Sequence, residues 1–238
     1  MRQNHDPACI NYINTVFANE TPHMQQVRLK GEEVLAGMQI SPHEGKLLYV
    51  LAKMIAAKNI LEIGTFVGYS TLWLADSLPD DGRITTIELR PEQAEIARNH
   101  FATSPHNHKI NILEGRALDI LATIRHHING NYDMIFIDAA KAQYYEYVQI
   151  CEPLLRVGGL MLLDNSLLFG NVYHDDNYPS DNNLGDNYSS NICKVAKKSS
   201  PAAIASVRAA NEYLAQNYDA ILIPTEEGLT VAMKKHQF

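Results

Sequence analysis

The sequence has few cysteines and no long apolar run, and each of these features argues against a class of protein. Its three cysteines are an odd number without CxxC spacing, which argues against a disulfide framework and favours reduced thiols. No apolar stretch approaches the roughly 20 residues of a membrane span. The N-terminus lacks the apolar core and cleavage site of a secretory signal. We therefore expect a cytoplasmic protein without a membrane partner.

Two common nucleotide-binding motifs are also absent. No GxxxxGK[ST] sequence occurs anywhere in the chain, which weakens a phosphoryl-transfer function. The GxGxxG fingerprint of NAD and FAD enzymes is missing as well, because only Gly64 and Gly68 stand near the first predicted strand. The formal net charge of −7 gives no overall attraction to nucleic acid. At 238 residues the chain is long enough for one well-buried core and short for two.

From residue 59 onward, short apolar runs alternate with helical segments. The runs predict strands over 59–64, 84–88, 111–115, 134–138 and 160–164, with helices over 69–78, 91–100, 117–128 and 143–155 between them. Such alternation predicts a Rossmann-like α/β fold, with a mostly parallel sheet and helices on both faces.

The two ends of the chain depart from this alternation. Residues 1–57 are expected to be a helical N-terminal addition, whose best-marked helix begins at Ser41-Pro42 with a capping box completed by Glu44. Residues 170–200 form a long polar loop, either a lid or a disordered segment. A helix over 201–216 and strands over 219–224 and 229–234 follow, and Glu227-Gly228 between these strands predicts an antiparallel hairpin. We expect a single domain over 1–238.

Two of the predicted strands end at acids. MIFID ends at Asp138, and LMLLD ends at Asp164 with Asn165 directly behind it. If these strands are neighbours about 4.8 Å apart, the three side chains can reach one point at the ligand-binding edge of the sheet. Carboxylate and amide oxygens suit Mg²⁺, Ca²⁺ or Mn²⁺. The trio predicts a metal site, and the alternative for each residue alone is capping or a turn.

The first two strands carry features of a nucleoside site. Gly64 and Gly68 allow a tight turn and close approach of a ligand to the backbone. Glu62 precedes this turn, and Glu88 ends the second strand, where an acid can bind ribose hydroxyls. Together these residues favour a nucleoside ligand without a pyrophosphate.

The ordered segments LEIGTFVGYS, TIEL, EGRAL, FIDAAK and LLDNSL resemble the cation-dependent, S-adenosylmethionine-dependent O-methyltransferases. This family includes the catechol and caffeoyl-CoA O-methyltransferases and bacterial relatives. The resemblance covers about residue 38 to the C-terminus. It implies a seven-stranded sheet with the antiparallel hairpin at one edge, and a homodimer.

The resemblance also implies roles for individual residues. Glu62, Gly64 and Ser70 would hold the methionine end of S-adenosylmethionine, Glu88 the ribose, and Ala117 the adenine. Asp138 would face both cofactor and metal. Further cofactor contacts would come from Met38, Ile40, Thr65, Phe66, Tyr69 and Leu89.

Lys141 stands where the family has its proposed proton acceptor, so Asp138 and Lys141 are the candidate catalytic residues. A cation nearby lowers the pKa of a lysine, which favours a general base, and substrate positioning or a plain ion pair are the alternatives. Tyr144, Tyr145 and Tyr147 follow, and at least one of them is expected in the core.

The sequence leaves the methyl acceptor open. The leading hypothesis is a hydroxyl of a small phenolic or catechol-like molecule. The second is a macromolecule, either 5-hydroxyuridine in tRNA or a protein side-chain oxygen. Many relatives have Asp where this chain has Ala140, and Asp-Ala-Ala-Lys followed by Gln143-Tyr144 resembles the tRNA-modifying relatives. The third is a cofactor-binding protein without catalysis.

Overall fold

A single seven-stranded sheet forms the centre of the computed structural model, which describes residues 7–127, 131–173, 199–225 and 227–236. The strand order is β3-β2-β1-β4-β5-β7-β6. All neighbouring pairs from β3 to β5 are parallel, and β7 runs antiparallel to both β5 and β6. The predicted α/β class, the mostly parallel sheet and the antiparallel C-terminal hairpin are confirmed.

Apart from the start of β5, the strands begin and end close to the predicted positions. They are β1 (Asn59–Ile63), β2 (Arg83–Glu88), β3 (Ile110–Glu114), β4 (Tyr132–Ile137), β5 (Leu155–Leu163), β6 (Tyr218–Ile223) and β7 (Leu229–Lys234). The helices are α1 (Pro7–Phe17), α2 (Pro22–Val34), α3 (Pro42–Met54), α4 (Tyr69–Ser77), α5 (Pro91–Ala102), α6 (Ala117–His127), α7 (Tyr144–Cys151) and α9 (Pro201–Asn217), with short 3₁₀ turns η1 (Asn107–Lys109), η2 (Lys141–Gln143), η3 (Glu152–Leu154) and η4 (Leu168–Gly170).

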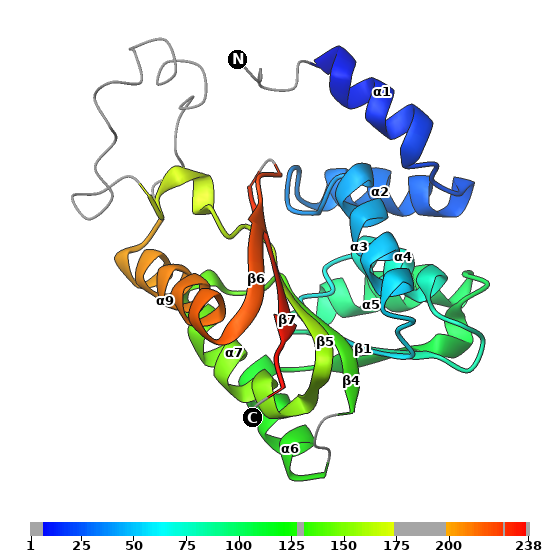
Figure 1. Ribbon diagram of the computed structural model, residues 1–238. Helices are drawn as coiled ribbons and strands as arrows, with labels where there is room; N and C mark the ends of the chain where they lie inside the picture. Colours follow the sequence, from blue (N-terminus) through cyan, green and yellow to red (C-terminus); the bar gives the residue numbers. More distant parts are fainter. Residues whose placement is uncertain (1–6, 128–130, 174–198, 226, 237–238) are drawn as a thin grey trace.

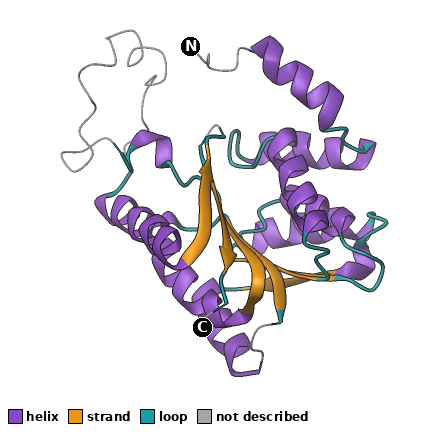
Figure 2. Cartoon of the chain, viewed as in Figure 1, coloured by secondary structure: helices purple, strands orange, loops and turns teal. Residues whose placement is uncertain are grey.

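Helices cover both faces of the sheet (Figures 1 and 2). One apolar cluster joins the sheet to helices α2 to α5 through residues such as Val27, Leu48 and Trp73. The other joins the opposite face to α6, α7 and α9 through residues such as Leu121 and Leu214. Because both faces are buried, the central strands are mostly apolar, as in MIFI of β4. No helix among the described residues is long and apolar enough to cross a bilayer.

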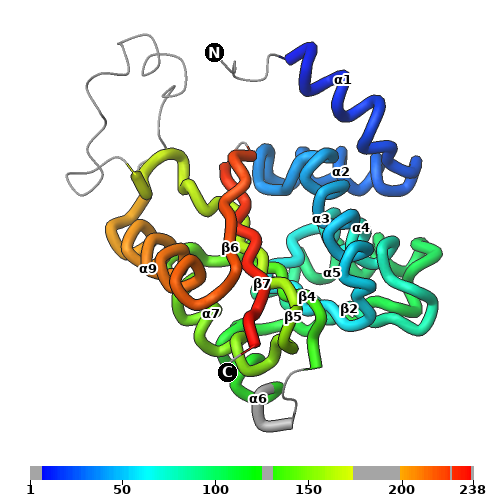
Figure 3. The backbone as a smooth tube through the Cα atoms, in the orientation of Figure 1, coloured from blue at the N-terminus to red at the C-terminus, as the bar shows by residue number. Residues whose placement is uncertain are grey.

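The N-terminal region is helical, as predicted, but it is divided into three helices that each begin at a proline. The capping box is confirmed at α3, where Ser41 accepts from the backbone of Glu44 and the Glu44 carboxylate accepts from the backbone of Ser41. Helix α1 lies farther from the sheet than α3 (Figure 3) and has no buried residue. The N-terminal helices therefore add a cover to one side of the sheet.

Two neighbouring boundaries were predicted wrongly. The expected helix over 143–155 ends at Cys151, and the expected strand over 160–164 begins already at Leu155. Pro153 lies in the 3₁₀ turn between them, where its missing N–H and fixed φ end the α-helix. The predicted helix end at residue 128 and most of the polar loop over 170–200 lie outside the described residues.

The sheet brings together the ends of its central strands. Strands β4 and β5 are neighbours with Ile137 opposite Leu163, so Asp138 and Asp164 follow paired positions. Asp138 N donates to Ile63 O (2.8 Å), and Asp164 N donates to Ile137 O (3.0 Å), which extends the ladder past the strand ends. The expected adjacency of the two acids is confirmed.

Candidate active site

A cavity of about 1000 Å³ runs along the carboxyl ends of the parallel strands. It is large enough for a nucleoside cofactor and a small second molecule. Its lining contains nearly all of the residues singled out from the sequence, namely Met38, Ile40, Gly64, Thr65, Phe66, Tyr69, Ser70, Glu88, Leu89, Ala117, Asp138, Lys141, Asp164 and Asn165. The predicted site residues therefore converge, with Glu62 as the exception.

The turn from β1 into α4 forms the floor of this cavity. Gly64 has φ +102°, and Gly64 N donates to Ile87 O (2.9 Å). A Cβ at residue 64 would lie 2.0 Å from Asp138 O, so β1 and β4 approach too closely here for any side chain. Gly68 (φ +92°) ends the turn. Both glycines are thus required by the backbone itself.

Glu88 is buried at the end of β2 and holds the same turn. Its Oε2 accepts from the backbone N–H groups of Thr65 (3.2 Å) and Phe66 (2.8 Å), and its Oε1 accepts from Arg90 N (2.9 Å). An ionised carboxylate can accept about four hydrogen bonds. Three are used within the chain, which leaves room for a ligand hydroxyl at the cavity wall.

Replacing Glu88 with alanine is expected to lower the affinity for S-adenosylhomocysteine at least about tenfold, since one charge-assisted hydrogen bond and the turn are lost together. Calorimetric titration measures this change. Glu114→Ala is the matched control, because Glu114 is the neighbouring strand-end acid on β3 and lies outside the cavity lining. Unchanged affinity in the Glu88 variant would contradict a ribose contact.

Glu62 lies behind the lining and is fully buried. Its carboxylate accepts from the hydroxyls of Ser70 (2.6 Å), Thr71 and Thr86 (2.6 Å). Burial raises the pKa of Glu62 to about 7, although the three hydroxyl donors lower it. Ser70 is the residue through which Glu62 meets the cavity, and a direct contact of Glu62 with a cofactor stays a prediction.

The raised pKa of Glu62 predicts a pH-dependent stability. The ordinary pKa of this carboxyl is 4.5, and its pKa in the folded chain is about 7. Between these two pH values the folded chain keeps a proton that the unfolded chain has released, so the free energy of unfolding falls as pH rises. The loss amounts to about 3 kcal/mol and levels off above pH 7. In Glu62→Gln this part of the slope is expected to vanish, as measured by urea unfolding from pH 5 to pH 8. Glu33→Gln, at an exposed glutamate, should keep the wild-type slope.

Asp138, Asp164 and Asn165 all line the cavity, and the two acids follow paired positions at the ends of β4 and β5. Burial and the charge of Asp138 raise the pKa of Asp164 well above its usual value. Asn165 has φ +53°, a left-handed conformation that asparagine tolerates well. Among the described residues, no three His, Cys, Asp or Glu side chains gather as metal ligands. The predicted trio differs from such a cluster because its third oxygen comes from an amide.

Lys141 lies beside this trio. Its Nζ donates to Asp138 Oδ1 (2.7 Å) and to the hydroxyl of Tyr144 (2.6 Å). Burial alone would lower the pKa of Lys141, but the carboxylates of Asp138 and Asp164 outweigh it and the pKa is raised. Lys141 therefore carries its proton in this arrangement.

The three tyrosines after Lys141 have different surroundings. Tyr144 is fully buried, with its hydroxyl 3.0 Å from Asp164 O and 3.2 Å from Ile137 O, so it ties the ends of β4 and β5 to Lys141. Tyr147 lines the cavity, and its hydroxyl donates to Gln143 Oε1 (2.8 Å). Tyr145 faces away and packs edge-on against Tyr213.

Several lining residues were not found from the sequence. Arg28, Glu32 and Gln39 come from α2 and the segment after it. Arg28 pairs with Glu20 through two hydrogen bonds (2.8 and 3.0 Å), and the Tyr69 hydroxyl also donates to Glu20 (2.7 Å). This network fixes α2 over the cavity. No motif marks these residues, because their role depends on how distant helices pack.

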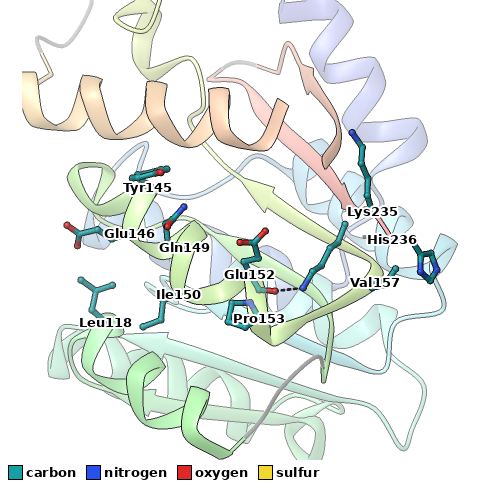
Figure 4. Close-up of a pocket in the computed structure, with 11 residues that line it drawn as sticks. Leu118, Tyr145, Glu146, Gln149, Ile150, Glu152, Pro153, Val157, Lys235 and His236 are labelled. Atoms are coloured by element: carbon teal, nitrogen blue, oxygen red, sulfur yellow. Dashed lines mark hydrogen bonds between the residues drawn. The ribbon is translucent and has the colours of Figure 1, made fainter. Parts of the chain in front are cut away.

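A second hollow lies between α7 and the C-terminal end of the described chain (Figure 4). Its lining includes Tyr145, Glu146 and Gln149 of α7 and none of the predicted cofactor, metal or catalytic residues. Lys234 Nζ donates there to the backbone carbonyl oxygens of Glu152 (2.6 Å) and Leu155 (2.8 Å). We assign this hollow no chemistry.

Comparison with known proteins agrees with the site geometry. A family model described as O-methyltransferase matches residues 15–235. A catechol O-methyltransferase from Niastella koreensis is 40% identical over 145 residues, 61% of this chain and 66% of that protein. Caffeoyl-CoA O-methyltransferase 2 from Petunia hybrida is 38% identical over 172 residues, 69% of this chain and 70% of that protein.

The fold is also found among solved structures. The O-methyltransferase TomG from Streptomyces achromogenes, involved in tomaymycin synthesis and solved in complex with S-adenosylmethionine, superposes with a TM-score of 0.78 at 32% identity, over 95% of both chains. The family match spans nearly the whole chain, and the cavity contains the residues on which the resemblance rests. The chain therefore belongs to the O-methyltransferase family.

Proposed function

We propose that this enzyme transfers the methyl group of S-adenosylmethionine to a hydroxyl of a small catechol-like acceptor and that the transfer depends on a divalent cation. The observation that carries the proposal is one cavity that joins the Glu88 end of β2 to the paired strand-end acids Asp138 and Asp164. The span of the family match also supports our proposal of a single class I methyltransferase domain over 1–238, with 1–57 as a helical addition and 170–200 as a polar loop.

The donor set at the ends of β4 and β5 fits a hard cation. Asp138, Asp164 and Asn165 would hold Mg²⁺, or Ca²⁺ or Mn²⁺, through oxygen ligands. Burial, and after it the charge of Asp138, raise the pKa of Asp164, so a cation beside the two carboxylates would favour the ionised form of Asp164. When bound, such an ion lowers the pKa of an acceptor hydroxyl.

The cofactor end of the cavity fits S-adenosylmethionine, which supplies the methyl group when bound. We propose that Glu88 binds the ribose and that Leu89 and Ala117 flank the adenine. The β1–α4 turn, with Gly64, Thr65, Phe66, Tyr69 and Ser70, would hold the methionine end, and Met38 and Ile40 would cover it. Fixing both reactants in one cavity is the chain's main contribution to rate, because an in-line transfer depends on orientation.

Lys141 is proposed to accept the acceptor's proton or to position its oxygen. Its Nζ is protonated while it faces Asp138 and Asp164, and it can act as a base once a cation offsets those charges. Tyr144 holds Nζ in place through its hydroxyl.

Replacing Lys141 with glutamine is expected to lower kcat by about a hundredfold or more while S-adenosylhomocysteine affinity is kept. If Lys141 is the base, the pH dependence of kcat is lost with the amine; if it positions the acceptor, KM rises and the pH profile stays. Steady-state kinetics from pH 6 to pH 10 separates the two roles. Lys58→Gln, at an exposed lysine paired with Asp81, is the control. An unchanged kcat and KM would remove Lys141 from the site.

The acceptor class is tested with radiolabelled S-adenosylmethionine. Catechols, tRNA carrying 5-hydroxyuridine and protein extracts are each incubated with the enzyme, with and without a chelator. We expect label on catechol only, and only without the chelator. Label on tRNA or protein alone would favour the macromolecular alternative, which the net charge of −7 disfavours for tRNA.

A homodimer and a cytoplasmic location stay predictions. Three exposed apolar residues on α1 are candidates for a subunit contact, namely Tyr12, Val16 and Phe17.

A further inference from the structure

Arg28 is a charged residue of the cavity lining that the proposed function does not use. It belongs to α2, and its side chain is 26% exposed. Its Nε and Nη2 donate to the Glu20 carboxylate (2.8 and 3.0 Å), whereas Nη1 donates to no acceptor among the described residues. A guanidinium has more N–H groups than the pair with Glu20 uses. Arg28 can therefore bind a second acceptor that enters the cavity.

A shared carboxylate places the Arg28 side chain beside the start of α4. The Tyr69 hydroxyl donates to Glu20 Oε1 (2.7 Å), the same oxygen that accepts from Arg28 Nε (2.8 Å). Because both groups are bonded to one oxygen, the guanidinium lies next to the Tyr69 hydroxyl. Tyr69 and its neighbour Ser70 begin α4, and both line the cavity. Arg28 thus borders the wall of the cavity that the β1–α4 turn and the start of α4 form.

A backbone contact ties Arg28 to the segment after α2 as well. Gln39 Nε2 donates to Arg28 O (2.6 Å), so this segment lies against α2 at residue 28. Gly31 makes room for the Gln39 side chain, because a Cβ at residue 31 would lie 2.2 Å from Gln39 Oε1. Met38 and Ile40, on either side of Gln39, are the residues proposed to cover the methionine end of the cofactor. Arg28 therefore contacts the cover of this end and borders its wall.

The other basic residues of the described lining are engaged or follow other strands. They are Arg90, Arg116 and Lys141. Lys141 is paired with Asp138 at the proposed metal site. Arg90 follows β2 and Arg116 follows β3, at the end of the cavity where we place the ribose and the adenine. Arg28 is thus the basic residue of the described lining that remains for an anionic group beside the β1–α4 turn.

We infer that Arg28 binds the α-carboxylate of the methionine moiety of S-adenosylmethionine. The inference rests on the proposed function and adds a binding residue to it. A guanidinium matches a carboxylate in geometry as well as in charge. Glu20 holds the Arg28 side chain in one position before the ligand enters, so little side-chain entropy is lost on binding. Since the pair with Glu20 lowers the net charge here, the contact depends on short hydrogen bonds more than on long-range attraction.

The test compares two ligands that differ only in this carboxylate. They are S-adenosylhomocysteine and its decarboxylated analogue, 5′-deoxy-5′-(3-aminopropylthio)adenosine, and the affinity of each is measured by calorimetric titration. We expect the wild type to bind S-adenosylhomocysteine at least about tenfold more tightly than the analogue. In Arg28→Gln this preference should shrink at least about tenfold, because affinity for S-adenosylhomocysteine falls while affinity for the analogue is kept. Lys30→Gln, at an exposed residue of the same helix that pairs with Glu33, should keep the wild-type preference.

A double variant separates the loss of a contact from the exposure of a charge. Arg28→Gln leaves the Glu20 carboxylate without its cation, and this carboxylate would by itself repel an anionic ligand. In the double variant Glu20→Gln/Arg28→Gln that charge is gone, and the preference for S-adenosylhomocysteine should stay low. Arg28→Lys should restore part of the preference, because lysine keeps the charge without the planar fork.

Four results would overturn the inference and leave the proposed function standing. The first is equal affinity of the wild type for the two ligands, which needs no variant. The others are an unchanged preference in Arg28→Gln, equal losses for both ligands in that variant, and recovery of the wild-type preference in the double variant. Failure of the wild type to bind S-adenosylhomocysteine at all would overturn the proposed function itself.

Discussion

Replacing Asp164 with alanine is expected to lower methyl transfer to catechol on the order of a thousandfold, because a metal ion supplies several kcal/mol of stabilisation to the developing oxyanion. The residue is 6% exposed, and it follows β5 directly beside Asp138 at the end of β4. Affinity for S-adenosylhomocysteine should be nearly unchanged, since the proposed cofactor contacts lie in the β1–α4 turn and the start of α4, at the end of β2, on α6 and in the segment before α3. Rates with saturating Mg²⁺ and calorimetric titration measure the two quantities.

The same variant has a thermodynamic signature that does not depend on turnover. Mg²⁺ is expected to raise the Tm of the wild-type protein, because an ion that binds only the folded state stabilises it. This shift should be absent in Asp164→Ala and retained in Asp219→Ala, an exposed aspartate on β6 paired with Lys235. Wild-type turnover by the Asp164 variant would remove Asp164 from the metal site.

The second large effect is expected at Gly64. Replacement with alanine should destabilise the fold by about 3–5 kcal/mol, because the new Cβ would lie 2.0 Å from Asp138 O and the φ of +102° is unfavourable for a side chain. A loss of this size is a large part of the total stability of an ordinary domain. The clash also pushes Asp138 away from its position, so any folded fraction should have lost activity.

Gly37 provides a matched control for the Gly64 variant. It also has a positive φ (+67°), but a Cβ there would meet nothing within 4 Å. Gly37→Ala therefore measures the conformational cost alone, about 1 kcal/mol. Urea unfolding measures the loss in the free energy of unfolding for each variant. The difference between the two losses is the contribution of the close approach between β1 and β4. Equal losses in the two variants would show that the contact with Asp138 contributes nothing.

Much of this site could be predicted from local sequence patterns. Asp138 and Asp164 each end an apolar run, and parallel strands place such ends along one edge of the sheet. Ser41 and Glu44 have the spacing of a capping box, which is a purely local interaction. Gly64 and Gly68 mark a turn that few other residues can adopt. In each case a few neighbouring residues determine the geometry.

Other features depend on contacts between distant segments. Arg28 reaches the cavity only because α2 packs over α4, where Glu20 and Tyr69 fix it. Glu227 lines the site because the β6–β7 hairpin meets the turn after β5, where Leu167 N donates to Glu227 O (2.9 Å). The end of α7 was placed too late because the apolar pattern continues past Pro153 into β5. Periodicity alone cannot separate a helix end from the start of a buried strand.

Glu88 illustrates a function that a pattern predicts only in part. Its position at the end of β2 suggests a ribose ligand, but the structure shows it first as the acceptor for three backbone N–H groups. A carboxylate that is already held by the chain is well oriented for a ligand, because its rotamer is fixed before binding. The structural and the proposed ligand-binding roles therefore reinforce each other.

The central claim is that two strand-end carboxylates and an amide hold a cation on which methyl transfer depends. The most direct measurement is the initial rate of catechol methylation by enzyme stripped with EDTA, as Mg²⁺ is returned stepwise at fixed S-adenosylmethionine. We predict a rate near background without the ion and a saturable return to full activity. Full activity in the stripped enzyme, unchanged as Mg²⁺ is added, would contradict the account.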